Sequence, residues 1–267
     1  MGFVRVTKQG PCPVCQRGDW CRVFSDGWIE CMRVQSERPA RSGGWMHWPG
    51  EAPRRYTPPP ARVQPPTINA MKLMRGWWTS TEEGQRAAFA RELGLSARSL
   101  AAVGAAWAPP HAAWAFPMCD GYGNVVGIRL RNERGKFAVR GSRQGIFVAN
   151  KDGSDQQDGS ERMLFVCEGP TDTAAAVELG LFAVGRPNCC CGGPEIRIYA
   201  RRQAVARVVV VADNDKPGLD GAHKVGAELG LPWAIYVPPA KDVREFVRLG
   251  GTRTMIENTL KGTVWNQ

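Results

Sequence analysis

The stretch from Met163 to Asp215, MLFVCEGPTDTAAAVELGLFAVGRPNCCCGGPEIRIYARRQAVARVVVVADND, decides the fold. Short apolar runs alternate in it with helix-like segments, the first of which has a capping signal near Thr171. One apolar run ends in Glu168, and the last one ends in Asp213-Asn214-Asp215. This alternation predicts an α/β fold with a parallel sheet, whose acidic residues lie at the carboxyl ends of the strands, where such sheets bind ligands.

The carboxylates of this stretch have a spacing that favours metal binding. Asp213 and Asp215 are two residues apart, so their side chains point the same way if the strand geometry continues. Without a neighbouring His or Cys, such a pair is typical of a hard cation such as magnesium, which keeps several waters and is completed by substrate phosphates. Glu168 ends a strand that is expected to lie beside the strand preceding Asp213. It is a candidate general acid/base or further metal ligand. Either fragment alone is also ordinary turn chemistry.

Two motifs resemble a known family. Glu168-Gly169-Pro170-Thr171-Asp172, followed by Asp213-Asn214-Asp215, resembles the Toprim domain of bacterial and phage primases, topoisomerases and some nucleases. Lys241-Asp242-Val243-Arg244-Glu245 resembles the Lys-Asp segment near the end of that domain in phage primases. The resemblance to the phage and plasmid primases covers most of the chain.

The resemblance implies roles for individual acidic residues. It gives Glu168 an acid/base role in nucleotidyl transfer, and it gives Asp213 and Asp215 the binding of Mg²⁺ or Mn²⁺, with Glu168 as a further ligand. Asp172 and Asp242 become further catalytic candidates. Asp172 is equally explained as an acid in the first turn of a helix, and Asp242 as a helix cap.

The charge of the chain is unevenly distributed. The 267 residues carry a net charge of +10, and 43% of them are hydrophobic, enough for one large domain or two to three small ones. The surplus of Lys and Arg lies entirely in residues 1–150, whereas residues 151–267 are nearly balanced. A polyanionic partner is the natural interpretation, and a merely soluble basic protein is the alternative.

The cysteines favour a metal site in a reducing compartment. The chain has nine cysteines, an odd number, and Cys12-Pro13-Val14-Cys15 has the spacing of a zinc knuckle. Residues 1–10 lack the apolar core of a signal peptide, and no apolar run approaches the roughly 18 residues of a membrane helix. We therefore expect a cytoplasmic protein without membrane contact.

Residues 1–50 are predicted to form a zinc-binding module. Cys12, Cys15 and Cys31 are three ligands, in an arrangement that resembles the zinc ribbon preceding the polymerase domain of primases, but Val34 stands where a regular ribbon has the fourth. The fourth ligand is then Cys21 or His47. We favour His47, because Cys21 follows the first knuckle so closely that it can instead be a small buried residue. The alternative for the whole segment is a set of unliganded cysteines.

The same module is rich in aromatic and basic side chains. Tryptophans interleaved with arginines are typical of single-stranded nucleic-acid binding, although two of the four rings are needed for the module's own core. The rings are Trp20, Trp28, Trp45 and Trp48. Residues 51–66 are proline-rich and predict an extended, semi-rigid linker.

Residues 67–150 are predicted to fold as a small α+β subdomain. Helical patterns with a capping signal at Ser80–Glu83 and a cap at Ser96 precede a period-two pattern with turns near glycine, which indicates an antiparallel sheet reaching Val148. This part resembles the N-terminal subdomain of the primase polymerase core. An acidic loop at 152–158 is expected to join it to residues 151–267, the Toprim-like domain.

Basic residues of this subdomain are candidates for binding template or nucleoside triphosphate. Arg129 and Arg131 share one strand face, opposite Ile128 and Leu130, so an open basic face over a packed apolar one is predicted. A merely solvated face is the alternative. The candidates for nucleotide and nucleic-acid contact are Arg129, Arg131, Lys136, Arg140 and Arg143, together with Lys216 and Lys241 near the carboxylates.

These observations together favour a DNA primase that uses single-stranded DNA and ribonucleoside triphosphates in phage, plasmid or mobile-element replication. No Gly-x-x-x-x-Gly-Lys-Ser/Thr loop occurs in the sequence, so a helicase is expected to be a separate partner. Two other classes remain: a Toprim nuclease, because the same carboxylates cleave phosphodiesters, and a recombination mediator that binds DNA without catalysis.

Overall fold

The computed structural model describes residues 2–49, 67–149 and 162–266. The predicted linker and the predicted acidic loop lie outside the described residues. The chain divides into two compact units, residues 1–63 and 64–267. Each is described by itself.

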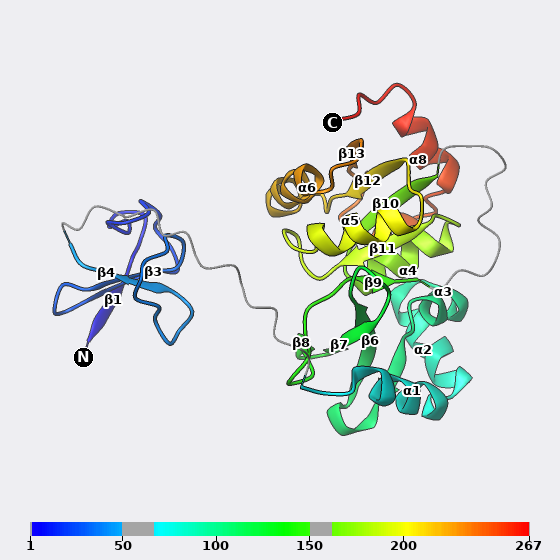
Figure 1. Ribbon diagram of the computed structural model, residues 1–267, viewed down its shortest axis with the longest axis horizontal. Coiled ribbons are helices and arrows are strands. Elements are labelled where there is room, and N and C mark those ends of the chain that lie inside the picture. Colours follow the sequence, from blue (N-terminus) through cyan, green and yellow to red (C-terminus); the bar gives the residue numbers. More distant parts are fainter. Residues whose placement is uncertain (1, 50–66, 150–161, 267) are drawn as a thin grey trace. The chain divides into compact units, whose positions relative to one another are not determined.

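The smaller unit is an antiparallel sheet with a minimal core. Its strands, in the order β1-β2-β3-β4, are β1 (Phe3–Arg5), β2 (Arg22–Phe24), β3 (Ile29–Cys31) and β4 (Trp45–His47) (Figure 1). The buried apolar side chains of this unit are Val6, Ile29 and three cysteines. So small an apolar core does not hold a fold by itself, and a covalent or metal staple is needed.

Three helices open the larger unit: α1 (Ala70–Ser80), α2 (Glu83–Leu93) and α3 (Ala97–Ala102). The cap predicted at Ser96 is present, and a cap lies within the signal predicted at Ser80–Glu83, but the capping residue there is Glu82 and Ser80 instead ends α1. Glu82 and Gln85 form a capping box at the start of α2, and the Ser96 side chain accepts a hydrogen bond from the backbone N–H of Ser99 at the start of α3. Helix α2 ends at Gly94, whose φ of 70° is left-handed and is readily adopted by glycine.

A four-stranded antiparallel sheet follows, in the order β5-β6-β7-β8. Its strands are β5 (Ala106–Ala108), β6 (Ala113–Cys119), β7 (Val125–Asn132) and β8 (Gly135–Ala138), with a short 3-10 helix, η1 (Pro109–His111), between the first two. On β7, Ile128 and Leu130 are buried in a core shared with α1, whereas Arg129 and Arg131 lie on the other face. The predicted alternation on this strand is confirmed.

The second sheet has five strands in the order β13-β12-β10-β11-β9. The strands are β9 (Phe147–Val148), β10 (Met163–Glu168), β11 (Ala183–Arg186), β12 (Arg207–Val211) and β13 (Trp233–Tyr236). The last four pair in parallel, which confirms the predicted α/β class. The prediction that residues 146–148 end the antiparallel sheet is wrong for β9, which pairs antiparallel with β11. Ile146 still bridges to Cys119 of β6.

Helices cover both faces of this sheet (Figure 1). They are α4 (Pro170–Glu178), α5 (Gly193–Arg202), α6 (Lys216–Glu228), α7 (Val243–Arg248) and α8 (Arg253–Leu260). Alternate residues of each strand enter different cores, as the period of a strand requires. Phe165 and Val209 pack in the core that contains side chains of α4, α7 and α8, whereas Leu164 and Val208 pack with α5 and α6.

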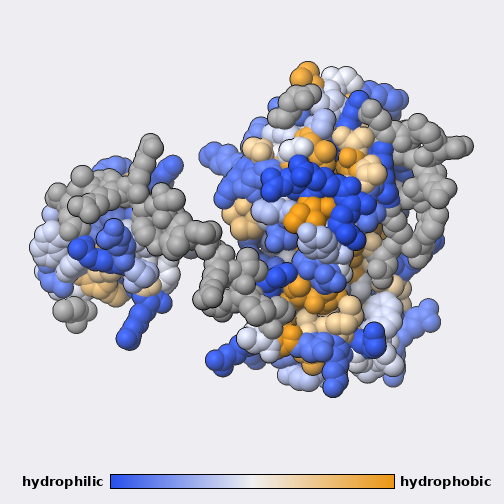
Figure 2. Space-filling view, in the orientation of Figure 1, coloured by the Kyte–Doolittle hydropathy of each residue, from blue (hydrophilic) through white to orange (hydrophobic). Residues whose placement is uncertain are grey.

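The surface is mostly polar. Figure 2 shows hydrophilic residues over most of the visible face of each unit, with apolar residues exposed in small patches between them. None of the described helices combines the length and the apolar character that crossing a bilayer requires.

A candidate acidic site and a four-cysteine centre

Two carboxylates meet at the carboxyl edge of the parallel sheet. Glu168 is the last residue of β10, and Asp213 follows β12 by two residues. These strands are direct neighbours, with Val166 opposite Val210. Gly169, with a φ of 85°, turns the chain sharply from β10 into α4, which places Asp172 in the first helical turn beyond the same edge. The sheet thus gathers three of the predicted acidic residues.

Two of these carboxylates have buried oxygen atoms without hydrogen-bond partners. Within the described chain, Glu168 Oε2 and Asp172 Oδ1 are both buried and accept no hydrogen bond. A buried carboxylate oxygen without a partner is costly. Polar atoms of this kind fit a ligand that offers positive charge or hydrogen-bond donors.

Asp215 and Asp242 are helix caps as well as neighbours of the site. The side chain of Asp215 accepts a hydrogen bond of 2.7 Å from Gly218 N at the start of α6, and that of Asp242 accepts one of 2.7 Å from Glu245 N at the start of α7. The strand geometry stops at Val211, so Asp213 and Asp215 do not share a strand face. Their chain segment is instead a turn, held in place because Asn214 N donates to Lys241 O over 2.8 Å.

The acidic residues raise one another's affinity for protons. Burial, followed by repulsion from Glu168, Asp242 and Asp215, raises the pKa of Asp213 to about 6, against the opposing charge of Arg186. Burial and the charge of Asp242 raise the pKa of Asp172 to about 7. The folded chain therefore concentrates negative charge that a bound cation would neutralise.

This concentration predicts a pH-dependent stability. Because the folded state raises the pKa of Asp172 from its ordinary value of 3.8 to about 7, the free energy of unfolding falls as the pH rises between these two values and levels off above about 7. Replacing Asp172 with Asn removes this penalty. The stability difference between the variant and the wild type, measured by urea unfolding in EDTA, should increase by about 2–4 kcal/mol from pH 4 to pH 8. Asp220→Asn, at an exposed position on α6, is the matched control, and an unchanged difference across this range would contradict the assignment.

Arg186 supports the site from within the core. It is the last residue of β11 and is completely buried. Its guanidinium donates to the backbone oxygens of Cys189 and Val211, the latter at 3.2 Å, and lies 3.7 Å from the Glu168 carboxylate. Sequence reasoning missed this residue. An arginine ending the otherwise apolar run of residues 181–186 was the available signal.

The predicted basic residues fall into two groups. Arg131 donates to Thr171 Oγ1 over 3.1 Å, and Arg129 donates to Pro187 O over 3.3 Å, so both side chains of β7 contact the segments that follow the parallel strands. Arg131 therefore lies next to Asp172, and Lys136 lies opposite Arg131 on the neighbouring strand β8. Arg244, which sequence reasoning did not single out, lies 3.5 Å from Asp242.

The remaining basic candidates are turned to other partners or to solvent. Arg143 lies 3.7 Å from Asp120, and Lys216, with 84% of its side chain exposed, pairs with Asp220 at 2.8 Å. Arg140 and Lys241 are exposed. The structure brings Arg129, Arg131 and Lys136 to the acidic edge, whereas no contact joins the side chains of these four to the carboxylates within the described residues; Lys241 contributes only its backbone oxygen, to Asn214 N.

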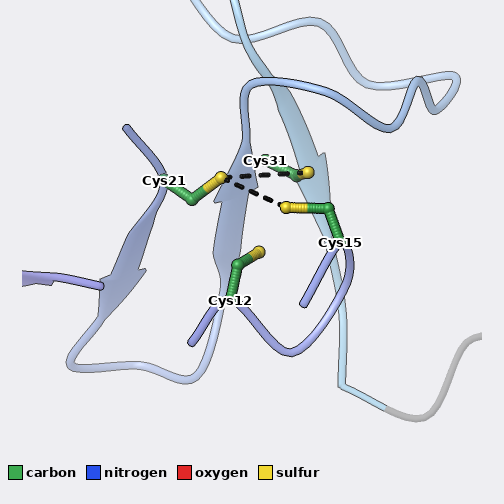
Figure 3. Close-up of side chains that lie close together, drawn as sticks. All are labelled: Cys12, Cys15, Cys21 and Cys31. Carbon is green, nitrogen blue, oxygen red and sulfur yellow. Dashed lines mark hydrogen bonds between the residues drawn. The ribbon is translucent and has the colours of Figure 1, made fainter. Parts of the chain in front are cut away.

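The four cysteines of the smaller unit form a compact centre (Figure 3). Cys15 Sγ lies 3.7 Å from Cys21 Sγ, which lies 4.0 Å from Cys31 Sγ, and the four sulfur atoms, including that of Cys12, all lie within 4.8 Å of one another. Zinc at about 2.3 Å from each of four tetrahedral thiolates would separate the sulfurs by about 3.8 Å. The donor set therefore fits zinc.

Backbone N–H groups prepare these thiols for a cation. Met32 N donates to Cys21 Sγ and Val34 N to Cys31 Sγ. Burial raises the pKa of Cys31 to about 12, while at Cys15 the hydrogen bond from the Arg17 backbone and those from neighbouring thiols outweigh burial and lower the pKa to about 7. Binding of a divalent cation would displace protons from these thiols, because thiol groups bind metal in their deprotonated form.

The preference for His47 as the fourth ligand is corrected by this geometry. His47 lies on β4, and its Nε2 is within 2.9 Å of Val34 O, which fixes the ring in a hydrogen bond. The short turn after the first knuckle brings Cys21 back to the other thiols, so its closeness in sequence is what makes it a ligand candidate. Cys21 is the fourth thiol of the cluster and replaces the ligand that a regular ribbon has at residue 34.

The carboxylates are more widely spaced than the thiols. Among the described residues, the four cysteines are the group of three or more metal-binding side chains whose donor atoms all lie within 4.8 Å of one another. The carboxylates at the sheet edge do not form such a group within the described residues.

Comparisons with known proteins identify the fold. No family model matches the sequence, and no curated protein matches it either. The zinc-binding and RNA polymerase domains of the Aquifex aeolicus primase match at 13% identity with a TM-score of 0.58, over 74% of this chain and 60% of that one. A DnaG catalytic core matches at 17% identity with a TM-score of 0.55, over 73% and 80%. A DnaG primase catalytic domain bound to single-stranded DNA matches at 19% identity with a TM-score of 0.52, over 72% and 80%. The chain shares the fold of these primase cores.

Proposed function

We propose that this chain is a DNA primase, which joins ribonucleotides into short RNA primers on a single-stranded DNA template during the replication of a phage, plasmid or other mobile element. The observation that carries the proposal is the pair Glu168 and Asp213, which follow adjacent parallel strands. Buried carboxylate oxygens without a hydrogen bond lie at the same edge, and Arg131 and Lys136 lie beside it. This arrangement, in the fold of a primase core, supports phosphate chemistry.

In this proposal the parts of the chain have separate tasks. Residues 1–50 are a zinc ribbon that engages template, residues 51–66 tether it, residues 67–150 are the N-terminal subdomain of the polymerase core, and residues 151–267 are a Toprim domain. Trp20, with 76% of its surface exposed, is available to stack on a template base, whereas Trp28 and Trp48 pack edge to face. Reduced thiols require a reducing compartment, so we place the protein in the cytoplasm.

The catalytic residues would act on a 3′ hydroxyl and a nucleoside triphosphate. Glu168, Asp213 and Asp215 would hold Mg²⁺ or Mn²⁺, which when bound neutralises phosphate charge and acidifies the hydroxyl. Glu168 assists by accepting the hydroxyl proton as the oxygen attacks the α-phosphorus, and the bond to the β-phosphate oxygen breaks to release pyrophosphate.

The surrounding residues would bind and orient the reacting groups. Arg131 and Lys136 lie where they can pair with the triphosphate. Arg186 fixes the position of Glu168. Asp172 and Asp242 add negative charge that strengthens cation binding. A replicative helicase is a further proposed partner.

Primer synthesis tests the proposal. Purified chain, single-stranded DNA of mixed sequence, labelled ribonucleotides and Mg²⁺ should yield short labelled oligoribonucleotides, and the Glu168→Gln variant should yield none. Labelled DNA in a parallel reaction detects cleavage. Shortened DNA without new strands would indicate a nuclease, and DNA binding without either product, unchanged by Glu168→Gln, would indicate a mediator.

The zinc site gives a separate prediction. Cys21→Ala should lose the bound metal, because three ligands remain at a site built for four, whereas His47→Gln should retain about one zinc per chain. Metal content of purified variants, measured by atomic emission, decides between the two ligands. Retention by Cys21→Ala together with loss by His47→Gln would restore His47 as the ligand.

A further inference from the structure

A cavity lies at the end of the parallel sheet opposite the carboxylates. It has a volume of about 580 Å³, and its walls include Met163 at the start of β10, Arg207 at the start of β12, and Phe182 just before β11. Glu168 ends the same strand that Met163 begins, five residues away, or about 17 Å along the strand. The cavity is therefore separate from the acidic site.

The walls of this cavity carry a positive charge. The charged side chains that the structure describes there are Arg162, Arg207, Arg253 and Lys261, against Glu257 alone. Glu257 is already engaged, since its Oε1 accepts from Arg253 Nε over 2.7 Å. The surplus of positive charge attracts an anion.

Two arginines of the wall are stacked on aromatic rings. The guanidinium of Arg162 lies 4.3 Å from the centre of the Phe182 ring, and that of Arg207 lies 5.2 Å from the centre of the Trp265 ring. Stacking through the face of each guanidinium group fixes its position in the wall of the cavity.

Arg162 has a donor that the chain does not satisfy. Its Nη1 donates to Gln203 O over 2.7 Å, but within the described residues its Nε is buried and has no acceptor. A buried N–H without an acceptor is costly, so the site fits a ligand with acceptor oxygens.

We propose that this cavity binds a nucleoside triphosphate at a site distinct from the carboxylates. The phosphates pair with the guanidinium groups of Arg162 and Arg207 and with Lys261, and the base packs against the aromatic side of the wall at Trp265. A bare anion would leave the apolar part of the wall, which includes Leu181, without a contact, and the volume is within the range of small-molecule sites. The inference does not depend on the activity proposed above.

The test measures nucleotide binding with the acidic site disabled. Isothermal titration calorimetry of the Asp213→Asn chain with ATP in EDTA, where cation-dependent binding at the carboxylates is suppressed, should show one site. Introducing Arg207→Ala or Lys261→Ala into this chain should weaken ATP binding about tenfold or more, because each removes a charged contact with phosphate. Arg201→Ala, which removes an exposed arginine of α5 outside the cavity, should leave the affinity unchanged.

Lys261 is exposed, so its replacement tests the site even if Arg207→Ala perturbs folding. Inorganic triphosphate and adenosine, titrated separately, should each bind at least tenfold more weakly than ATP. Absence of ATP binding, equal weakening by Arg201→Ala, or inorganic triphosphate binding as tightly as ATP would each overturn the assignment of a nucleotide site.

Discussion

Asp213→Asn is expected to lower the rate of nucleotide incorporation by about 10³-fold. Asp213 lies at the end of β12, and its raised pKa of about 6 reflects burial and the three neighbouring carboxylates. A neutral amide of the same size keeps the shape of the turn but removes the charge that would hold a cation against the triphosphate. The loss should appear in kcat, measured by incorporation of labelled ribonucleotide at saturating substrate.

A matched control comes from the next helix. Asp220→Asn changes the same chemical group at an exposed position, where the carboxylate pairs only with Lys216 in the described structure, and its activity should stay within twofold of the wild type. Binding of Mn²⁺, followed by electron paramagnetic resonance, should weaken in Asp213→Asn and not in Asp220→Asn. Wild-type activity in Asp213→Asn would remove this carboxylate from the reaction.

Arg186→Met is expected to destabilise the larger unit by about 3–5 kcal/mol. Arg186 is completely buried and compensates the charge of Glu168 while binding two backbone oxygens. Methionine has a similarly long side chain but leaves the carboxylate and both carbonyls without the guanidinium. Removing one partner of a buried ion pair costs about 3–5 kcal/mol of stability. Urea unfolding followed by circular dichroism measures the change.

The double variant separates the ion pair from simple packing. In Arg186→Met with Glu168→Gln, part of the loss should be recovered, a coupling of about 1–3 kcal/mol, because no uncompensated charge remains. Arg201→Met, at an exposed position on α5, should change stability by less than about 0.5 kcal/mol. A loss below about 1 kcal/mol in Arg186→Met would show that the guanidinium is dispensable.

Local patterns predicted the parallel sheet and the acidic edge. The run ending in Glu168 and the run ending before Asp213 have strand length and turn signals, and parallel strands place their ends at one edge. The cap at Ser96 and a helix start near residues 80–83 were equally readable, because capping depends on residues three positions apart, although the capping residue there is Glu82. Strands, their ends and helix caps depend on residues close together in the sequence, and these features could therefore be predicted.

Long-range packing escaped sequence reasoning. The choice between Cys21 and His47 depends on how the chain returns after the first knuckle, which spacing alone does not determine. The burial of Arg186 depends on its contacts with Val211 and Glu168, which lie on other strands. The short segment β9 could extend the edge of either the antiparallel or the parallel sheet. A strand of two residues has no sequence pattern that predicts which sheet it joins.

The position of β9 has a consequence for how the larger unit unfolds. Ile146 exchanges two backbone hydrogen bonds with Cys119 of the antiparallel sheet, of 2.7 and 2.8 Å, and the next two residues pair with β11 of the parallel sheet. Three consecutive residues thus join both sheets, so one cannot open without straining the other. Amide hydrogens of both sheets should therefore exchange with solvent through a common opening event, with a shared dependence on denaturant, as a single cooperative unit.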